Sequence, residues 1–149
     1  GPAWRIFAAE RDVRFEEMEY EVPVANAVAA LKAVLAGIRA ARMPLIFPLE
    51  FRWVAGDDIW LSPFHGCSCA SISIHQYARM PWAEHIAQLE QVLRAHGGRP
   101  HWAKRHTLSS DDVLSLYPRA ADFGRVRNDV DPKGKFMNAH TRHLFGFSL

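Results

Sequence analysis

The chain has 149 residues, a length typical of a single domain whose core covers roughly two-thirds of the surface of the unfolded chain. Apolar residues make up 49% of it, with five Trp and nine Phe, so the sequence is not that of a disordered protein. Its 18 basic and 16 acidic residues are spread along the chain without a Lys/Arg block, which argues against nucleic acid as a partner.

The cysteine content and the apolar runs indicate where in the cell the chain is located. Cys67 and Cys69 are too few to build the disulfide framework of a small secreted domain, so we expect a reducing compartment. No apolar run reaches the ~18 residues of a membrane span, and no signal-peptide pattern opens the chain. We therefore expect a soluble chain, and leave open whether the whole protein is cytoplasmic or membrane-associated.

The first 42 residues predict a strand followed by a helix. Residues 11–22 alternate in the manner of a half-buried strand. The apolar face is made by Met18, Tyr20 and Val22, and the acidic face by Glu17, Glu19 and Glu21. Pro23 ends this strand. Apolar side chains then recur at steps of three and four, which predicts an amphipathic helix to about Arg42, before Pro44.

Two further strands are predicted in residues 45–77. Residues 45–54 place Glu50 and Arg52 on one face and five apolar side chains on the other, namely Leu45, Phe47, Leu49, Phe51 and Trp53. Pro48 indicates an edge position or a bulge. After a turn at residues 56–58 and a short extended piece at 59–63, residues 69–77 alternate again, with a polar face of Ser71, Ser73, His75 and Tyr77.

The second half of the chain is mainly helical in its pattern. A helix begins near Pro81 and stops at His96-Gly97-Gly98, and residues 99–104 are predicted to be extended. The cluster at residues 109–112 is an N-cap signal for a short helix that ends before Pro118. Residues 120–130 and 136–145 predict two more helices, separated by a turn at 131–134. The order of elements predicts one α+β domain: an antiparallel sheet with helices packed on one face, followed by a small helical C-terminal tail.

The pair Glu50-x-Arg52 is the first candidate for chemistry. Two residues apart on a strand, its carboxylate and guanidinium point the same way and offer acceptors and donors to a polyhydroxylated ligand. The alternative is a surface ion pair on a solvated strand face, worth under about 1 kcal/mol. The spacing alone leaves both interpretations open.

Two other groups are weaker candidates. In residues 100–104, Lys104 follows His101 and Trp102, where a fixed positive charge would stabilise a developing anion; the alternative is a basic, solvent-facing strand. His75 is either a general base or a hydrogen-bonded structural residue. The segment His65-Gly66-Cys67-Ser68-Cys69 lacks a second pair of ligands at zinc spacing, so we predict no metal site.

Three segments together resemble a known family. They are residues 47–63 (FPLEFRWVAGDDIWLSP), residues 97–104 (GGRPHWAK), and Leu116-Tyr117-Pro118 followed by residues 131–138 (DPKGKFMN). In collinear order from about Phe15 to the end, the chain is similar to the aldonolactone oxidases of the vanillyl-alcohol oxidase flavoprotein family. Its members include L-gulono-, L-galactono- and D-arabinono-1,4-lactone oxidases, with alditol oxidases more distant.

The resemblance implies an enzyme of two parts: an N-terminal domain that holds FAD, and a cap domain that covers the flavin and forms the substrate pocket. Residues 1–149 match the later part of the cap domain plus the C-terminal tail. The FAD-binding domain has no counterpart in the chain, so the resemblance implies an incomplete FAD site.

The resemblance also implies roles for individual residues. Glu50 and Arg52 match the pair that positions the sugar lactone, and Lys104 matches the lysine beside the flavin's pyrimidine end. His101 and Trp102 lie in the same motif and are assigned to the cofactor with it. His75 corresponds to a histidine near the reacting hydroxyl in the polyol-oxidising relatives, although the animal lactone oxidases have an apolar residue there.

The implied reaction is oxidation of the hydroxyl next to the carbonyl of L-gulono- or D-arabinono-1,4-lactone, with hydride transfer to FAD and an ascorbate-type product. The alternative is a non-catalytic cap or assembly module that needs a separate flavin-binding domain or chain. If its natural cover is missing, we expect the face with Glu50, Arg52 and His75 to be exposed, and a homodimer through that face is a consequence.

Overall fold

Two long antiparallel strands form the centre of the fold. The computed structural model describes residues 1–6, 8 and 12–147. In it, β1 (Phe15–Pro23) pairs along its whole length with β3 (Cys69–Tyr77). β2 (Glu50–Val54) joins the other edge of β3, and the two-residue β4 (Arg99–Pro100) joins β1. The result is an antiparallel sheet in the order β2-β3-β1-β4.

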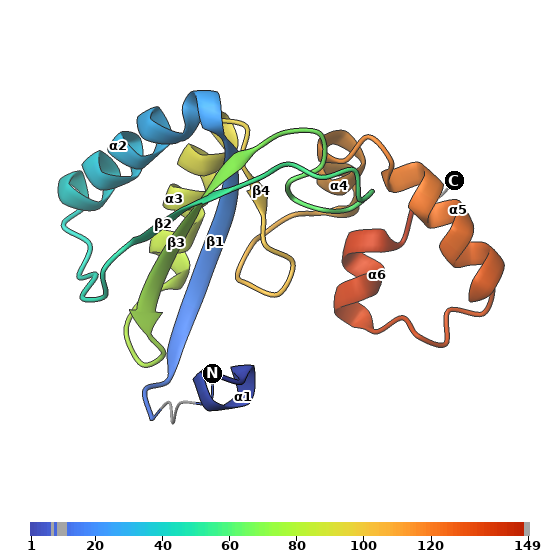
Figure 1. Cartoon of the computed structure of the whole chain (residues 1–149), viewed down its shortest axis with the longest axis horizontal. Helices are drawn as coiled ribbons and strands as arrows, with labels where there is room; N and C mark the ends of the chain where they lie inside the picture. Colours follow the sequence, from blue (N-terminus) through green and yellow to red (C-terminus); the bar gives the residue numbers. More distant parts are fainter. Residues whose placement is uncertain (7, 9–11, 148–149) are drawn as a thin grey trace.

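Two helices cover one face of this sheet (Figure 1). α2 (Val24–Ala40) and α3 (Ala83–Ala95) place their apolar stripes against the strands and against each other. Between the helices and the sheet lie the side chains that alternate with the acidic residues of β1. The central members of this core are Met18, Tyr20, Val22, Val34, Ile72, Ile74, Leu89 and Leu93.

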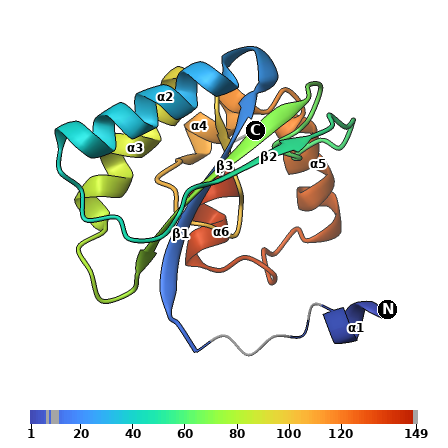
Figure 2. The same ribbon diagram turned by 60° about the vertical axis from the view of Figure 1, so that its left-hand side comes forward.

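The C-terminal third forms a group of short helices beyond β4 (Figure 1). They are α4 (Ser110–Leu116), α5 (Ala120–Val130) and α6 (Ala139–Phe145). Ser109 and Asn138 begin α4 and α6 with capping boxes, in which each side chain accepts a hydrogen bond from a backbone N–H of the first turn. α1 (Ala3–Ile6) buries no residue and lies apart from the sheet (Figure 2). The predicted α+β class, antiparallel sheet and helical tail are confirmed.

The end of α3 depends on two adjacent glycines. Gly97 has a φ of +79°, a left-handed conformation that favours glycine after a helix. A Cβ on Gly98 would lie 2.7 Å from the carbonyl oxygen of Leu93 and 3.1 Å from the Tyr20 ring. The chain therefore turns directly from α3 into β4, which brings the segment that follows to the edge of β1.

Three predicted extended segments are shorter than expected. Residues 45–49 are not part of β2, because Pro44 and Pro48 have no N–H to donate to a strand partner. Residues 59–63 form turns around Asp57, which accepts hydrogen bonds from Ile59 N–H and the Ser62 hydroxyl. Residues 101–104 leave the sheet after β4 as a turn. The start of the first predicted strand, at Arg11, lies outside the described residues.

None of the helices in the described part of the chain is both long and apolar enough to cross a membrane.

The contact between α3 and the sheet gives a stability prediction. Leu93 is fully buried there, so Leu93→Ala leaves a cavity and should lower the free energy of unfolding by about 2–5 kcal/mol. Val28→Ala, on the exposed side of α2, is the control and should cost less than ~0.5 kcal/mol. Urea unfolding followed by circular dichroism measures both, and equal losses would contradict the packing described.

Candidate functional site

The strand register assembles a polar surface on the face of the sheet opposite α2 and α3. Across β1 and β3, Glu17 pairs with His75, Glu19 with Ser73, and Glu21 with Ser71. Across β3 and β2, the same two serines pair with Glu50 and Arg52. Side chains on one face of directly paired strands are close neighbours, so three acidic residues of β1 face hydroxyl, imidazole and guanidinium groups.

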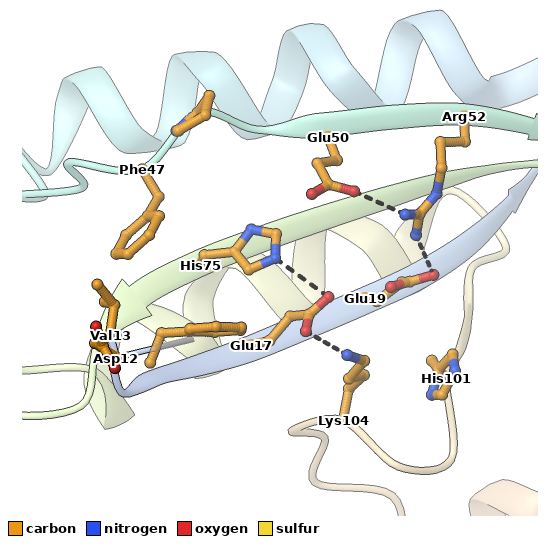
Figure 3. Close-up of a pocket in the computed structure, with 12 residues that line it drawn as sticks. Asp12, Val13, Glu17, Glu19, Phe47, Glu50, Arg52, His75, His101 and Lys104 are labelled. Atoms are coloured by element: carbon orange, nitrogen blue, oxygen red, sulfur yellow. Dashed lines mark hydrogen bonds and ion pairs between the residues drawn. The ribbon is translucent and has the colours of Figure 1, made fainter. Parts of the chain in front are cut away.

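Arg52 is the centre of one hydrogen-bonded group on this surface (Figure 3). It donates from one nitrogen to Glu50 (2.7 Å) and from the other to Glu19 (2.8 Å) and the Ser73 hydroxyl (3.3 Å). Ser73 in turn donates to the second Glu19 oxygen at 2.9 Å. The Arg52 and Glu50 side chains are 50% and 49% exposed, whereas Glu19 is 7% exposed. The buried Glu19 thus holds the guanidinium on the side of the sheet, and its other side is exposed.

Glu17 is the centre of a second group (Figure 3). One of its oxygens lies 3.3 Å from His75 Nε2, and the other forms an ion pair with the ammonium of Lys104. The His75 ring packs against the aromatic rings of Phe15 and Phe47, with centroid distances of 5.4 and 6.1 Å. This packing leaves 11% of the His75 side chain exposed.

Both groups open into one cavity of about 820 Å³. Its charged lining is balanced between acidic and basic side chains, and Phe15, Phe47 and Pro48 supply an apolar wall. The acidic and basic lining residues are Asp12, Glu17, Glu19, Glu50, Arg52, His75, His101 and Lys104. A cavity with many donors and acceptors beside one apolar wall suits a small, polyhydroxylated molecule.

Glu19 and Arg52 each shift the pKa of the other. Burial by itself raises the pKa of Glu19, but the Ser73 hydroxyl and the Arg52 guanidinium outweigh it and hold this pKa below its usual value. Burial also opposes the charge on Arg52, yet Glu19 and Glu50 raise its pKa. Arg52 and Glu19 are therefore an ionised pair, with Glu50 as a second, more exposed anion.

The loop at residues 101–106 brings Lys104 to the cavity. The N–H groups of His101 and Arg105 donate to the carbonyl oxygens of Glu19 and Glu17, at 2.9 and 2.8 Å. Trp102 is on the other side of this loop, where its indole N–H donates to the Leu61 carbonyl at 2.7 Å. Its ring packs against Tyr117 and Phe145 rather than lining the cavity.

Of the residues singled out from the sequence, the structure brings Glu50, Arg52, His75, His101 and Lys104 together. Trp102 lies outside the cavity. Glu17 and Glu19 are functional candidates that the sequence analysis did not select, because their alternating pattern looks the same on a solvent-facing strand. The expected exposure of the sheet face holds for Glu50 and Arg52 but not for His75, which Phe15 and Phe47 cover.

Comparison with known proteins identifies the family of the chain. The family model for D-arabinono-1,4-lactone oxidase matches residues 1–144. The chain belongs to the D-arabinono-1,4-lactone oxidase family. The resemblance noted in the sequence is thereby confirmed, and it covers nearly the whole chain.

Several curated relatives match the chain over most of its length. The chain is 38% identical over 144 residues to L-gulono-1,4-lactone dehydrogenase of Mycobacterium tuberculosis, covering 97% of the chain and 34% of the relative. It is 36% identical to alditol oxidase of a Streptomyces species, covering 86% and 31%, and 32% identical to L-gulonolactone oxidase of Bos taurus, covering 95% and 33%. The chain thus spans about a third of the length of these relatives.

The ionised pair of Arg52 and Glu19 gives a prediction about pH and stability. Because the pKa of Glu19 is lowered by folding, its contribution to stability is present above the unfolded pKa and is lost as the pH falls through the folded pKa. Arg52→Ala should therefore destabilise the protein more at about pH 7 than at about pH 3, by about 1 kcal/mol for this half-exposed pair.

Arg105→Ala is the matched control, because Arg105 pairs with Glu16 of the same strand but is 62% exposed. Its effect should differ by less than ~0.5 kcal/mol between the two pH values. Urea unfolding at both pH values provides the measurement. A loss from Arg52→Ala that is the same at both would contradict the ionised pair.

Proposed function

We propose that the chain binds a sugar 1,4-lactone in the cavity at the sheet face and takes part in its FAD-dependent oxidation. The arrangement of Arg52 carries this proposal: Glu19 and Glu50 hold the guanidinium, while half of the side chain stays open to the cavity. An arginine fixed in this way presents its remaining donors to the oxygens of a ligand at little cost in side-chain entropy. We assign Glu50 and Arg52 to lactone binding.

The substrate we propose is L-gulono- or D-arabinono-1,4-lactone. The family match and the names of the relatives, which are lactone dehydrogenases and oxidases, support a sugar lactone. The residues that line the cavity are also compatible with a sugar lactone. Each substrate hydroxyl can donate to a carboxylate such as Glu50 and accept from Arg52 or Lys104. Phe47 and Pro48 would lie against the less polar faces of the sugar ring.

FAD is the cofactor we propose, with Lys104 and His101 at its edge. When bound, FAD accepts the hydride from the substrate carbon. Lys104 fits such a role, because its ammonium has three donors, Glu17 takes one, and 29% of its side chain is exposed in the cavity. The positive charge would stabilise negative charge that develops beside it. Trp102 supports the loop that carries both residues.

We assign the proton of the reacting hydroxyl to His75. A Glu17 oxygen lies 3.3 Å from His75 Nε2, which favours a proton on this nitrogen, and Nδ1 would then accept the proton. The hydroxyl proton would pass to Nδ1, and Glu17 would stabilise the imidazolium. In the same reaction the hydride leaves the carbon that bears this hydroxyl, so the substrate is oxidised by two electrons to the ketone.

We further propose that residues 1–149 correspond to the later part of the cap domain plus the tail, and that a flavin-binding domain lies outside them. The share of the relatives that the chain covers, about a third, supports this view. The alternative is that the chain is a non-catalytic cap or assembly module, and the half-exposed Glu50 and Arg52 favour a surface that a partner covers. A second copy of the chain is one such partner.

The deciding experiment is the absorbance of the purified chain in the flavin bands, measured with dye reduction on L-gulono-1,4-lactone after FAD is added. Retention of FAD with turnover supports the enzyme. Protein that binds no FAD and reduces no dye refutes catalysis by residues 1–149 alone. Concentration-dependent mass by light scattering then tests self-association, which Arg52→Glu should abolish if the sheet face is the interface.

Substitutions in a catalytically active form test the residue assignments. Arg52→Ala should lower kcat/KM by about 30- to 150-fold, because the loss of charge-assisted hydrogen bonds to the lactone costs about 2–3 kcal/mol. Lys104→Ala should mainly slow flavin reduction, by about 100-fold in stopped-flow absorbance, since it removes a fixed charge from the reacting centre. Lys32→Ala, an exposed lysine of α2 on the opposite side of the sheet, is the control. Turnover within about twofold of the unmodified protein for both Arg52→Ala and Lys104→Ala would refute the assignment.

A further inference from the structure

Glu21 is a buried carboxyl group that the proposed reaction does not use. It follows Glu17 and Glu19 on the same face of β1, but is 1% exposed, and it does not line the cavity. The Ser71 hydroxyl donates to Oε2 of Glu21. Oε1 is fully buried and has no hydrogen-bond partner among the described residues. Burying an ionised carboxylate with one unpaired oxygen costs free energy, so the protonation state of Glu21 has to be explained.

The cations near Glu21 are committed elsewhere. Arg52 is in register with Ser71 and Glu21, but donates to Glu19, Glu50 and Ser73. Arg99 of β4 donates to the carbonyl oxygen of His65 at 2.8 Å and lies over the Tyr117 ring at 5.4 Å. The charged and titratable groups that act on Glu21 or are acted on by it are Glu19, Arg52, Cys69 and Tyr117. None of these provides an ion pair within the part of the chain that is described.

The neighbouring carboxylate offers an acceptor. Glu21 and Glu19 lie two residues apart on the same face of β1, so their carboxyl groups are neighbours, and Glu19, which accepts from Arg52 and Ser73, still has unused lone pairs. Burial, with the negative charge of Glu19, raises the pKa of Glu21 to about 7 against the opposing hydrogen bond from Ser71. A proton kept on Glu21 and hydrogen-bonded to the Glu19 carboxylate avoids a second, uncompensated negative charge in the same buried row.

We propose that Glu21 is a neutral carboxylic acid that donates its proton to Glu19 and thereby positions Arg52. The bare oxygen then becomes a hydrogen-bond donor, and its partner is the carboxylate that fixes the guanidinium. When Glu21 loses its proton, a second anion is created in the row of Arg52, which draws the guanidinium inward and away from the cavity. Glu21 is a positioning residue, and its effect on substrate rests on the proposed function.

The first test is infrared spectroscopy of the chain as it stands, and needs neither flavin nor turnover. A carboxylic-acid C=O band should persist at pH values at which ordinary glutamic acids are already ionised. It should disappear as the pH rises through about 7. Glu21→Gln should remove this band. Glu17→Gln, the same exchange on the same face of β1, should leave it. A spectrum of the unmodified chain without this band at about pH 6 overturns the proposal, as does a band that survives in Glu21→Gln.

Thermal unfolding gives an independent readout with a defined sign. The folded pKa of Glu21 is raised above its unfolded value, so its contribution to stability is fully present below the unfolded pKa and is lost as the pH rises through about 7. The Tm of Glu21→Gln, which imitates the protonated acid, should exceed that of the unmodified chain at about pH 8 by several degrees and match it at about pH 5. An equal difference at both pH values overturns the proposal.

One control variant tests which group accepts the proton of Glu21, and one kinetic measurement tests the consequence for substrate binding. Tyr117→Phe removes a buried hydroxyl near this site that also has no hydrogen-bond partner among the described residues, and should leave the band unchanged. A shifted band would assign the proton to Tyr117 instead and overturn the bond to Glu19. In an active form, the KM for lactone should rise about tenfold above neutral pH, and Glu21→Gln should remove this rise without a change in kcat. If the infrared band behaves as proposed but KM does not, the proposed substrate site fails and the shared proton stands.

Discussion

The register of β1 against β3 is the constraint on which the site depends. It places Glu17, Glu19 and Glu21 on one face of the sheet and Met18, Tyr20 and Val22 on the other. A slip of one residue would exchange these faces and bury three carboxylates against α2 and α3, at a cost that no pairing within that core could offset. The apolar face therefore fixes the polar one: packing against the helices determines which residue of β3 each glutamate meets, and hence which cation it can hold.

Charge balance then distinguishes three otherwise similar residues. Glu17 has Lys104 and His75, and Glu19 has Arg52 and Ser73. Glu21 has only Ser71 among the described residues, although it is the most deeply buried of the three. The two arginines in register with Glu21 bind elsewhere: Arg52 donates to Glu19 and Glu50, and Arg99 donates to the His65 carbonyl oxygen. Glu21 is therefore left without an ion pair among the described residues.

The sequence predicted the elements well where one physical signal dominated. Period-two alternation located β1 and β3, helical periodicity located α2 and α3, and the N-cap cluster at residues 109–112 located α4. It failed at residues 45–49, where apolar alternation continues across Pro48 but the hydrogen bonds do not. Phe47 consequently lines the cavity with Glu50 instead of sharing a face with Phe51, as the pattern had indicated. Glu17 and Glu19 were missed for another reason: alternation reveals that a residue faces away from the core, but not what lies above it.

The C-terminal helices belong to the site even though none of their residues lines the cavity. Lys104 reaches Glu17 only because its loop is fixed at both sides: by hydrogen bonds to the backbone of β1, and by Trp102, whose ring packs on Tyr117 and Phe145. Tyr117 follows α4 and Phe145 ends α6, so both aromatic contacts come from the tail. The tail thus acts on the cavity through Trp102. For the function proposed above, the tail therefore holds the Lys104 ammonium in place through a tryptophan that faces away from the cavity.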